Sequence, residues 1–191
     1  MSKIALSGDA SGTGTFTIAS PNSNSNFTLT LPTNSGTVLT SGSTANFPAG
    51  SVLQVVSAIT TTEVSTSTVD TWVSSGLTAS ITPRSTSSRI LIIASQNIGL
   101  DGTTGASDAQ FNLGIFRNST LVFGQIGFDD SRANTIVDFV YRAGVSYLDS
   151  PATTSSVTYT TRGSLRTAGI GILKMQYSSN FSSIILMEIA G

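Results

Sequence analysis

Hydrophobic and polar residues alternate along much of this chain. The stretches "TFTI" at 15–18, "FTLTL" at 27–31 and "QFNLGI" at 110–115 all follow this pattern. Because successive side chains of a strand point to opposite faces, the pattern predicts half-buried β-strands. No long window repeats apolar residues at helical spacing, and the good helix formers Glu, Lys and Gln are scarce. The chain is therefore expected to be all-β.

Turn-forming clusters of Gly, Pro, Asn, Asp and Ser separate the predicted strands after Gly50. Strands at this spacing, with no helix between them, predict an antiparallel jelly-roll-like sandwich of two packed sheets over residues 50–191. The predicted strands are Val52–Ile59, Asp70–Ser74, Leu77–Thr82, Arg89–Ile98, Ala109–Asn118, Thr120–Gly127, Thr135–Ala143, Ser156–Arg162, Gly169–Gln176 and Ser183–Ile189.

Two of these runs, Ile90–Ala94 and Ile184–Met187, are apolar at consecutive positions. A strand with this composition is expected to be covered on both faces. We therefore predict that both are central strands. The sandwich core would cover one face of each, and a neighbouring subunit the other.

Residues 1–49 have a different character and are predicted to form a β-rich anchoring segment. Three short β pieces are expected, at Gly14–Ala19, Asn26–Leu31 and Gly36–Thr40, followed by a linker at Thr44–Gly50. The first two belong to an imperfect repeat, "GTGTFTIASPN" and "SNFTLTLPTNSG". An isolated hairpin is marginal in water, so these pieces are expected to need a partner.

Charge is sparse and unevenly distributed. Charged residues make up 10% of the chain, which has 9 Lys and Arg, 10 Asp and Glu, and a formal net charge of -1. After Asp9 the next charged residue is Glu63. Exposed strand edges are usually protected by charge, particularly Lys. The uncharged segment is therefore expected to be covered by identical chains or by another protein, and we predict a homotrimer.

Several classes of chemistry are excluded by composition. The chain has no Cys and no His, so disulfides, the preferred zinc ligands and His-based catalysis are absent. The arginines form no basic cluster, which argues against a nucleic-acid partner. Arg84 and Arg89 are the nearest approach to a basic cluster. They could form an anion site or simply belong to a polar turn. No transmembrane span and no signal-peptide core are present, so synthesis in the cytoplasm without membrane insertion is expected. We expect no cofactor.

The segment "GTGTFTIASPNSNSNFTLTLPTNSGTVLTSG" resembles one found in tail-fibre and other virion structural proteins of bacteriophages, particularly marine and cyanobacterial ones. "SSRILIIASQNIG", "FNLGIFRNSTLVFG", "VSYLDSPATTSSVTYTTRG" and "SSIILMEIAG" extend the resemblance over nearly the whole chain. It implies a trimeric virion protein with a jelly-roll-like distal domain, and it brings no catalytic residues. The chain lacks the long repetitive shaft of a fibre, which leaves tail and capsid locations both open.

Several acidic residues in predicted loops and strands could bind a metal ion or act in hydrolysis, or could simply form polar turns. Asp101 and Asp108 flank "GTTGAS", which fits either a turn or a calcium loop without the carboxylate spacing of an EF-hand. Asp129 and Asp130 are adjacent, so in a strand they would point to opposite faces. Polysaccharide hydrolysis would need acidic side chains that converge on one substrate gap. The acids that could do so are Asp108, Asp129, Asp130, Asp149 and Glu188, but no spacing in the sequence requires it.

Trp72 is the only tryptophan and could stack on a sugar if exposed, or lie in the core or at a subunit interface. The same alternatives hold for the four tyrosines, Tyr141, Tyr147, Tyr159 and Tyr177. The candidate contacts for a host glycan or receptor are Trp72, Asp101, Asp108, Asp129 and Asp130. The leading hypothesis is a non-enzymatic tail fibre or surface projection, bound to other virion proteins through residues 1–49. A capsid decoration protein, a carbohydrate-binding adhesin and a polysaccharide depolymerase are the alternatives.

Overall fold

The structure is a computed structural model. It describes residues 11–15, 17, 19, 22–26, 28, 30, 33, 35, 47–102, 109–130, 139–166, 168 and 171–191, with the backbone alone at 109 and 125–130. The chain divides into two compact units, Met1–Val38 and Leu39–Gly191. The described residues of the first unit carry no strand, so the expected pieces Gly14–Ala19 and Asn26–Leu31 are not strands where they are described. The third piece, Gly36–Thr40, lies outside the described residues.

The second unit contains all the strands that the structure describes. One short 3-10 helix, Tyr177–Ser179, follows the ninth strand. The strands are β1 (Val52–Thr60), β2 (Val64–Thr66), β3 (Val73–Ile81), β4 (Arg89–Gly102), β5 (Ala109–Arg117), β6 (Thr120–Asp130), β7 (Phe139–Asp149), β8 (Val157–Leu165), β9 (Gly171–Met175) and β10 (Ser182–Ile189).

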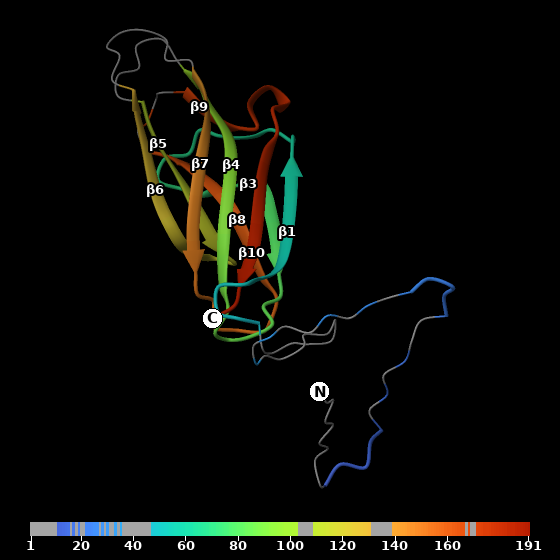
Figure 1. The fold of residues 1–191 in the computed structure, drawn as a ribbon. Helices are drawn as coiled ribbons and strands as arrows, with labels where there is room; N and C mark the ends of the chain where they lie inside the picture. Colours follow the sequence, from blue (N-terminus) through green and yellow to red (C-terminus); the bar gives the residue numbers. More distant parts are fainter. Residues whose placement is uncertain are drawn as a thin grey trace. The chain divides into compact units, whose positions relative to one another are not determined.

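Two antiparallel sheets form a jelly-roll sandwich, as the sequence predicts. One sheet contains β1, β10, β4 and β7 in that order, and Figure 1 shows these four strands side by side. The other has the order β3-β8-β5-β6. Successive strands therefore alternate between sheets at most connections, the arrangement of two interlocked Greek keys. The short strands β9 and β2 extend the first sheet, because β9 pairs with the end of β4 that continues past β10.

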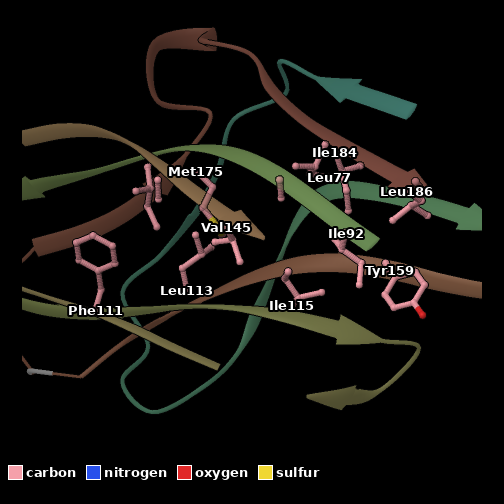
Figure 2. Close-up of a cluster of buried hydrophobic side chains, with 14 of the residues drawn as sticks. Leu77, Ile92, Phe111, Leu113, Ile115, Val145, Tyr159, Met175, Ile184 and Leu186 are labelled. Carbon is pink, nitrogen blue, oxygen red and sulfur yellow. The ribbon is translucent and has the colours of Figure 1, made fainter. Parts of the chain in front are cut away.

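Side chains from the inner faces of both sheets interleave to form the core. Ile92, Ile184 and Leu186 of the first sheet face Leu113, Ile115 and Tyr159 of the second (Figure 2). All six are at most 1% exposed. They occupy the inward positions of the period-2 pattern, so the alternation in the sequence sets which face of each strand is buried.

A layer of polar side chains crosses this core between the two sheets. Thr161 of β8 donates a hydrogen bond to Gln96 of β4 at 2.7 Å and lies 2.6 Å from the Ser75 hydroxyl of β3. The Gln96 amide also donates to the Ser182 hydroxyl of β10 at 3.0 Å. With its amide oriented to suit these neighbours, Gln176 donates to the Ser75 carbonyl at 2.9 Å. Because each group has partners, the layer joins the two sheets without unpaired polar atoms among these side chains.

The observed strands differ most from the predicted ones at three places. Asp70–Ser74 and Leu77–Thr82 are not two strands: Val73–Ile81 is continuous, with a register shift beside Gly76, which has a positive φ of 76°. The strand expected at Thr135–Ala143 runs instead from Phe139 to Asp149, and 131–138 lie outside the described residues. The three-residue strand β2 was not predicted.

The central placement of the two doubly apolar runs is confirmed. β10 lies between β1 and β4, and β4 lies between β10 and β7. Inward residues such as Ile92 are fully buried, whereas the outward Ile93 is 39% exposed. The sandwich core thus covers one face of these strands, and cover of the other face by a neighbouring subunit stays a prediction.

Candidate functional site

Trp72 lies on the outer face of the β3-β8-β5-β6 sheet and is half-buried. Its ring meets the Phe116 ring edge-on, with centroids 5.3 Å apart. A side chain at Gly114 of β5 would meet the indole at 3.1 Å, so this glycine makes room for it. The Arg162 guanidinium lies 4.3 Å above the Phe116 ring and completes the cluster. The tryptophan is therefore a packed part of this face.

Asp101, the second candidate residue, lies near the end of β4 and pairs with a lysine. Lys174 of β9 binds its carboxylate at 2.8 Å and lies 3.9 Å from Glu63. The hydrogen bond to Asp101 raises the pKa of Lys174. The Lys174 ammonium also lies 4.9 Å from the centre of the Tyr177 ring. This group of side chains ties β4, β9 and the loop before β2 together.

The side chains of the other three candidate acids lie outside the described residues. Asp108 lies outside the described residues. Asp129 and Asp130 belong to β6, where their backbone pairs with Gln110 and Ala109 of β5, and their side chains are outside the description. Trp72 directly precedes β3 of one sheet and Asp101 lies in β4 of the other, so the two are not brought together.

Two buried carboxylates are each bound by neighbouring groups of the fold. Asp149 of β7 accepts hydrogen bonds from the Tyr159 hydroxyl at 2.7 Å and from Arg117 at 2.8 Å. Burial is the main cause that raises the pKa of Tyr159, and the bond to Asp149 raises it further. Glu188 is fully buried and accepts from the Gln54 amide and the Arg84 backbone N–H, each at 2.6 Å. The two acids belong to separate clusters, so the convergence considered for hydrolysis does not involve them as a pair.

The arginine pair and Tyr147, which the sequence also offered as candidates, do not form a binding site with the residues described around them. Arg84 lies in the polar turn before β4 and Arg89 begins that strand, both exposed. Tyr147 packs on Phe123 with ring centroids 5.4 Å apart. Within the described ranges, no three His, Cys, Asp or Glu residues gather as metal ligands. No helix in the same ranges has the length and apolar character needed to cross a membrane.

The outer faces of the two sheets differ sharply in character. On β3 and β8 the outward positions hold Ser80, Thr78, Thr158 and Thr160, which hydrogen-bond to one another across the strands. Over β3 and β8, that face is polar and suited to water. On the β1-β10-β4-β7 sheet, by contrast, the outward positions are largely aliphatic.

This aliphatic surface, which we call the outer apolar face, follows from the strand register. One row across the four strands is Val55, Met187, Leu91 and Leu148, and the next is Ser57, Ile185, Ile93 and Ser146. Val52, Ile189 and Ile59 extend it on β1 and β10. The most exposed side chains are Ile59 at 70%, Val55 at 55% and Val52 at 53%. The doubly apolar runs 90–94 and 184–187 indicated this surface in the sequence, whereas the contribution of β1 and β7 was missed.

Within the described residues, this outer apolar face is the largest group of uncovered hydrophobic side chains. Of the ten large hydrophobic residues that are exposed, only Leu121 belongs to the other sheet. Charge lies at its ends, at Arg89 and at Arg142, whose guanidinium stacks 4.3 Å above the Phe181 ring. Exposed apolar patches of this kind mark interaction surfaces in soluble proteins.

The strand order defines the chain as an eight-stranded jelly-roll sandwich with two added short strands. No protein-family model and no curated protein sequence matches it. Among solved structures it is similar to dimeric latent PorU from Porphyromonas gingivalis, with 11% identity, a TM-score of 0.41, and coverage of 76% of this chain and 14% of that one.

The chain is also similar to two structures from infectious bursal disease virus. The match to the Gx strain has 12% identity and a TM-score of 0.38, and covers 72% of this chain and 37% of that one. The match to the VP2 subviral particle has 12% identity and a TM-score of 0.36, and covers 73% and 38%. The chain thus spans less than two-fifths of each protein it matches here, and the fold assignment rests on its own strand order.

Proposed function

We propose that this chain is a non-enzymatic structural subunit of a bacteriophage virion. In this proposal it forms a homotrimeric tail fibre or surface projection, and other virion proteins hold it through residues 1–49. The jelly-roll domain is displayed outward, where it can contact the host surface. The proposal assigns no reaction, cofactor or nucleic-acid partner to the chain.

The observation that carries this proposal is the outer apolar face on a jelly-roll sandwich. A sheet with four strands of uncovered aliphatic residues fits a subunit of a larger assembly better than a protein that works alone. By analogy at the level of the fold, jelly rolls recur in viral capsid and lectin domains. The resemblance of "LTLPTNSGTVLTSG" and the later segments to phage virion proteins supports the same assignment.

The test is to locate the chain on the virus particles whose genome encodes it. Purified virions would be labelled with gold-conjugated antibodies raised against the chain and imaged, and their proteins would be identified by mass spectrometry. Gold at the tail or at projections supports the proposal. Gold distributed evenly over the head would support a capsid decoration protein instead, and absence of the chain from purified virions would refute a structural role.

A glycan array separates the adhesin alternative. Strong binding of one glycan class, abolished by Trp72→Ala in a chain that still folds, would assign receptor binding to the cluster around Trp72. The structural proposal alone expects Trp72→Ala to affect stability and no glycan signal to depend on it, because the indole packs on Phe116 and Gly114.

A further inference from the structure

We propose that the outer apolar face is the contact surface between copies of this chain, and that another copy covers it in solution. The inference rests on the proposed function, in which the chain is a homo-oligomer, and it specifies where the copies meet. The face comprises the outward residues of β1, β10, β4 and β7, with Ile93 and Ile185 paired near its centre.

Size is the first argument for a protein partner. Four strands about 4.8 Å apart, each contributing about eight residues at 3.3 Å per residue, give a face of roughly 500 Å² in projection. Stable interfaces bury about 800 Å² of accessible surface per partner, and side-chain relief makes accessible surface larger than projected area. The face is therefore of the size that a specific protein contact needs.

Charge is the second argument, and it favours another copy over a different protein. The central rows, which contain Ile93 and Met187, have no charged residue. Partners of different sequence generally recognise one another through complementary charge, which this face cannot offer. A copy of the same face brings no like charge to the centre. The flanking serines, Ser57 and Ser146, can donate to and accept from polar groups on a copy, because a hydroxyl does both.

The edge of the sheet is the third argument. β1 ends the β1-β10-β4-β7 sheet, yet its sequence "VLQVVSAIT" has no charged residue and no proline. Edge strands that remain open to water usually have such protection against unwanted pairing. Its outward residues Val52, Val55 and Ile59 are each more than half exposed in the single chain. A neighbouring copy that packs on the face would also cover these side chains.

The absence of cysteine allows a direct test by single-cysteine labelling in the full chain. Ile93→Cys places a thiol at the centre of the face, and Ser80→Cys places the matched control on the exposed outer face of the other sheet. Reaction rates with a maleimide reagent would be measured at micromolar concentration and normalised to those of the unfolded chain. We expect the normalised reaction rate of the Ile93→Cys thiol to be lower than that of the Ser80→Cys thiol by a factor of about ten or more.

Sedimentation analysis of the wild-type chain completes the test. A mass of at least two chains of 19.7 kDa each, with slow reaction of the thiol at position 93, supports the inference. A monomer, or an oligomer in which both thiols react at the same normalised rate, overturns it. A dimer with position 93 protected would support this face as the contact while refuting the proposed trimer. Absence of the chain from virions, with protection intact, would refute the proposed function alone.

Discussion

The hydroxyl of Tyr159 donates a hydrogen bond to the buried carboxylate of Asp149, 2.7 Å away, and so links the two sheets of the sandwich. Asp149 lies at the end of β7 and Tyr159 lies in β8, ten residues later in the chain. Arg117 of β5 binds the same carboxylate oxygen at 2.8 Å. The three residues fix how β7, β8 and β5 meet at one end of the core.

Replacement of Tyr159 by Phe is expected to destabilise the domain by about 1.5–3 kcal/mol, the usual contribution of a hydrogen bond to a charged group. The ring still fills its site, so the loss reports the hydroxyl. Tyr147→Phe is the matched control, because the Tyr147 hydroxyl has no hydrogen bond to any described residue and its ring is half-buried. Urea unfolding of the three proteins measures the difference. Equal losses in the two variants would contradict the role given to the Tyr159–Asp149 bond.

Alkaline pH is expected to weaken the domain through the same residue. The pKa of Tyr159 is raised in the folded state, mainly by burial, whereas the unfolded tyrosine ionises near its usual value of about 10. Its contribution is therefore complete below about pH 10 and is lost as pH rises above that value, by up to about 1.4 kcal/mol per pH unit. The stability difference between wild type and Tyr159→Phe should shrink above pH 10. A constant stability difference through the alkaline range would show that Tyr159 ionises as freely in the folded chain as in the unfolded chain.

The polar layer in the core gives a second pair of variants. Thr161→Val removes the donor to Gln96 and the partner of Ser75 while keeping the shape of the side chain. Because it leaves buried polar atoms without partners, we expect a loss of about 1–3 kcal/mol. Thr160→Val, on the outer face of the same strand, should change stability by no more than about 0.5 kcal/mol. Denaturant midpoints that fall in the opposite order would refute the assignment of the two faces of β8.

The sequence predicted the sandwich well because period-2 alternation determines which face of a strand is buried. It predicted β3 and β7 poorly for local reasons. Gly76 has turn character but here allows a register shift inside one strand. The β7 prediction ended at Ala143, before Gly144, yet the strand continues to Asp149 because Val145 and Tyr147 alternate in phase with Ala143. A single glycine therefore was not enough to end either strand.

The candidate site was harder to predict, because a surface depends on register between strands that are far apart in the sequence. Met187 lies beside Leu91 and Val55 only because β10 pairs with both β4 and β1. The runs 90–94 and 184–187 indicated two-sided burial, but Leu148 and Val55 belong to segments with ordinary alternation. The candidate Trp72 could not be placed either, since its position depends on Gly114 of a different strand.

The domain is expected to fold without the N-terminal segment. The backbone N–H of Gly50 bonds to the Ala190 carbonyl at 2.8 Å, and that of Ala190 bonds to the Ser51 carbonyl at 2.9 Å, so the strands of the sandwich begin close to residue 50. A fragment from Phe47 to Gly191 contains the whole described sandwich and should unfold in one cooperative transition. Thermal unfolding followed by circular dichroism tests this. A fragment with no transition would mean that residues 1–46 are needed for the fold.

The last prediction uses two neighbours on β4 that point to opposite faces. Ile92 is fully buried in the core, and Ile93 is 39% exposed at the centre of the outer apolar face. Ile92→Asp would bury an unpaired carboxylate at a cost of about 3–5 kcal/mol, a large part of a total stability of roughly 5–15 kcal/mol. We expect this variant to lose its cooperative unfolding transition.

Ile93→Asp should instead keep the strand signal in circular dichroism and a cooperative transition, because its carboxylate can reach water in the single chain. If copies of the chain meet at this face, the charge should prevent their association, and the variant should sediment at 19.7 kDa. Thr86→Asp, in the exposed turn before β4, serves as the control that neither unfolds nor dissociates. If Ile93→Asp unfolded as completely as Ile92→Asp, the single chain would not be stable with the outer face of β4 uncovered, and the expected folded monomer would be refuted. If it folded and still assembled like the wild type, the copies would have to meet elsewhere.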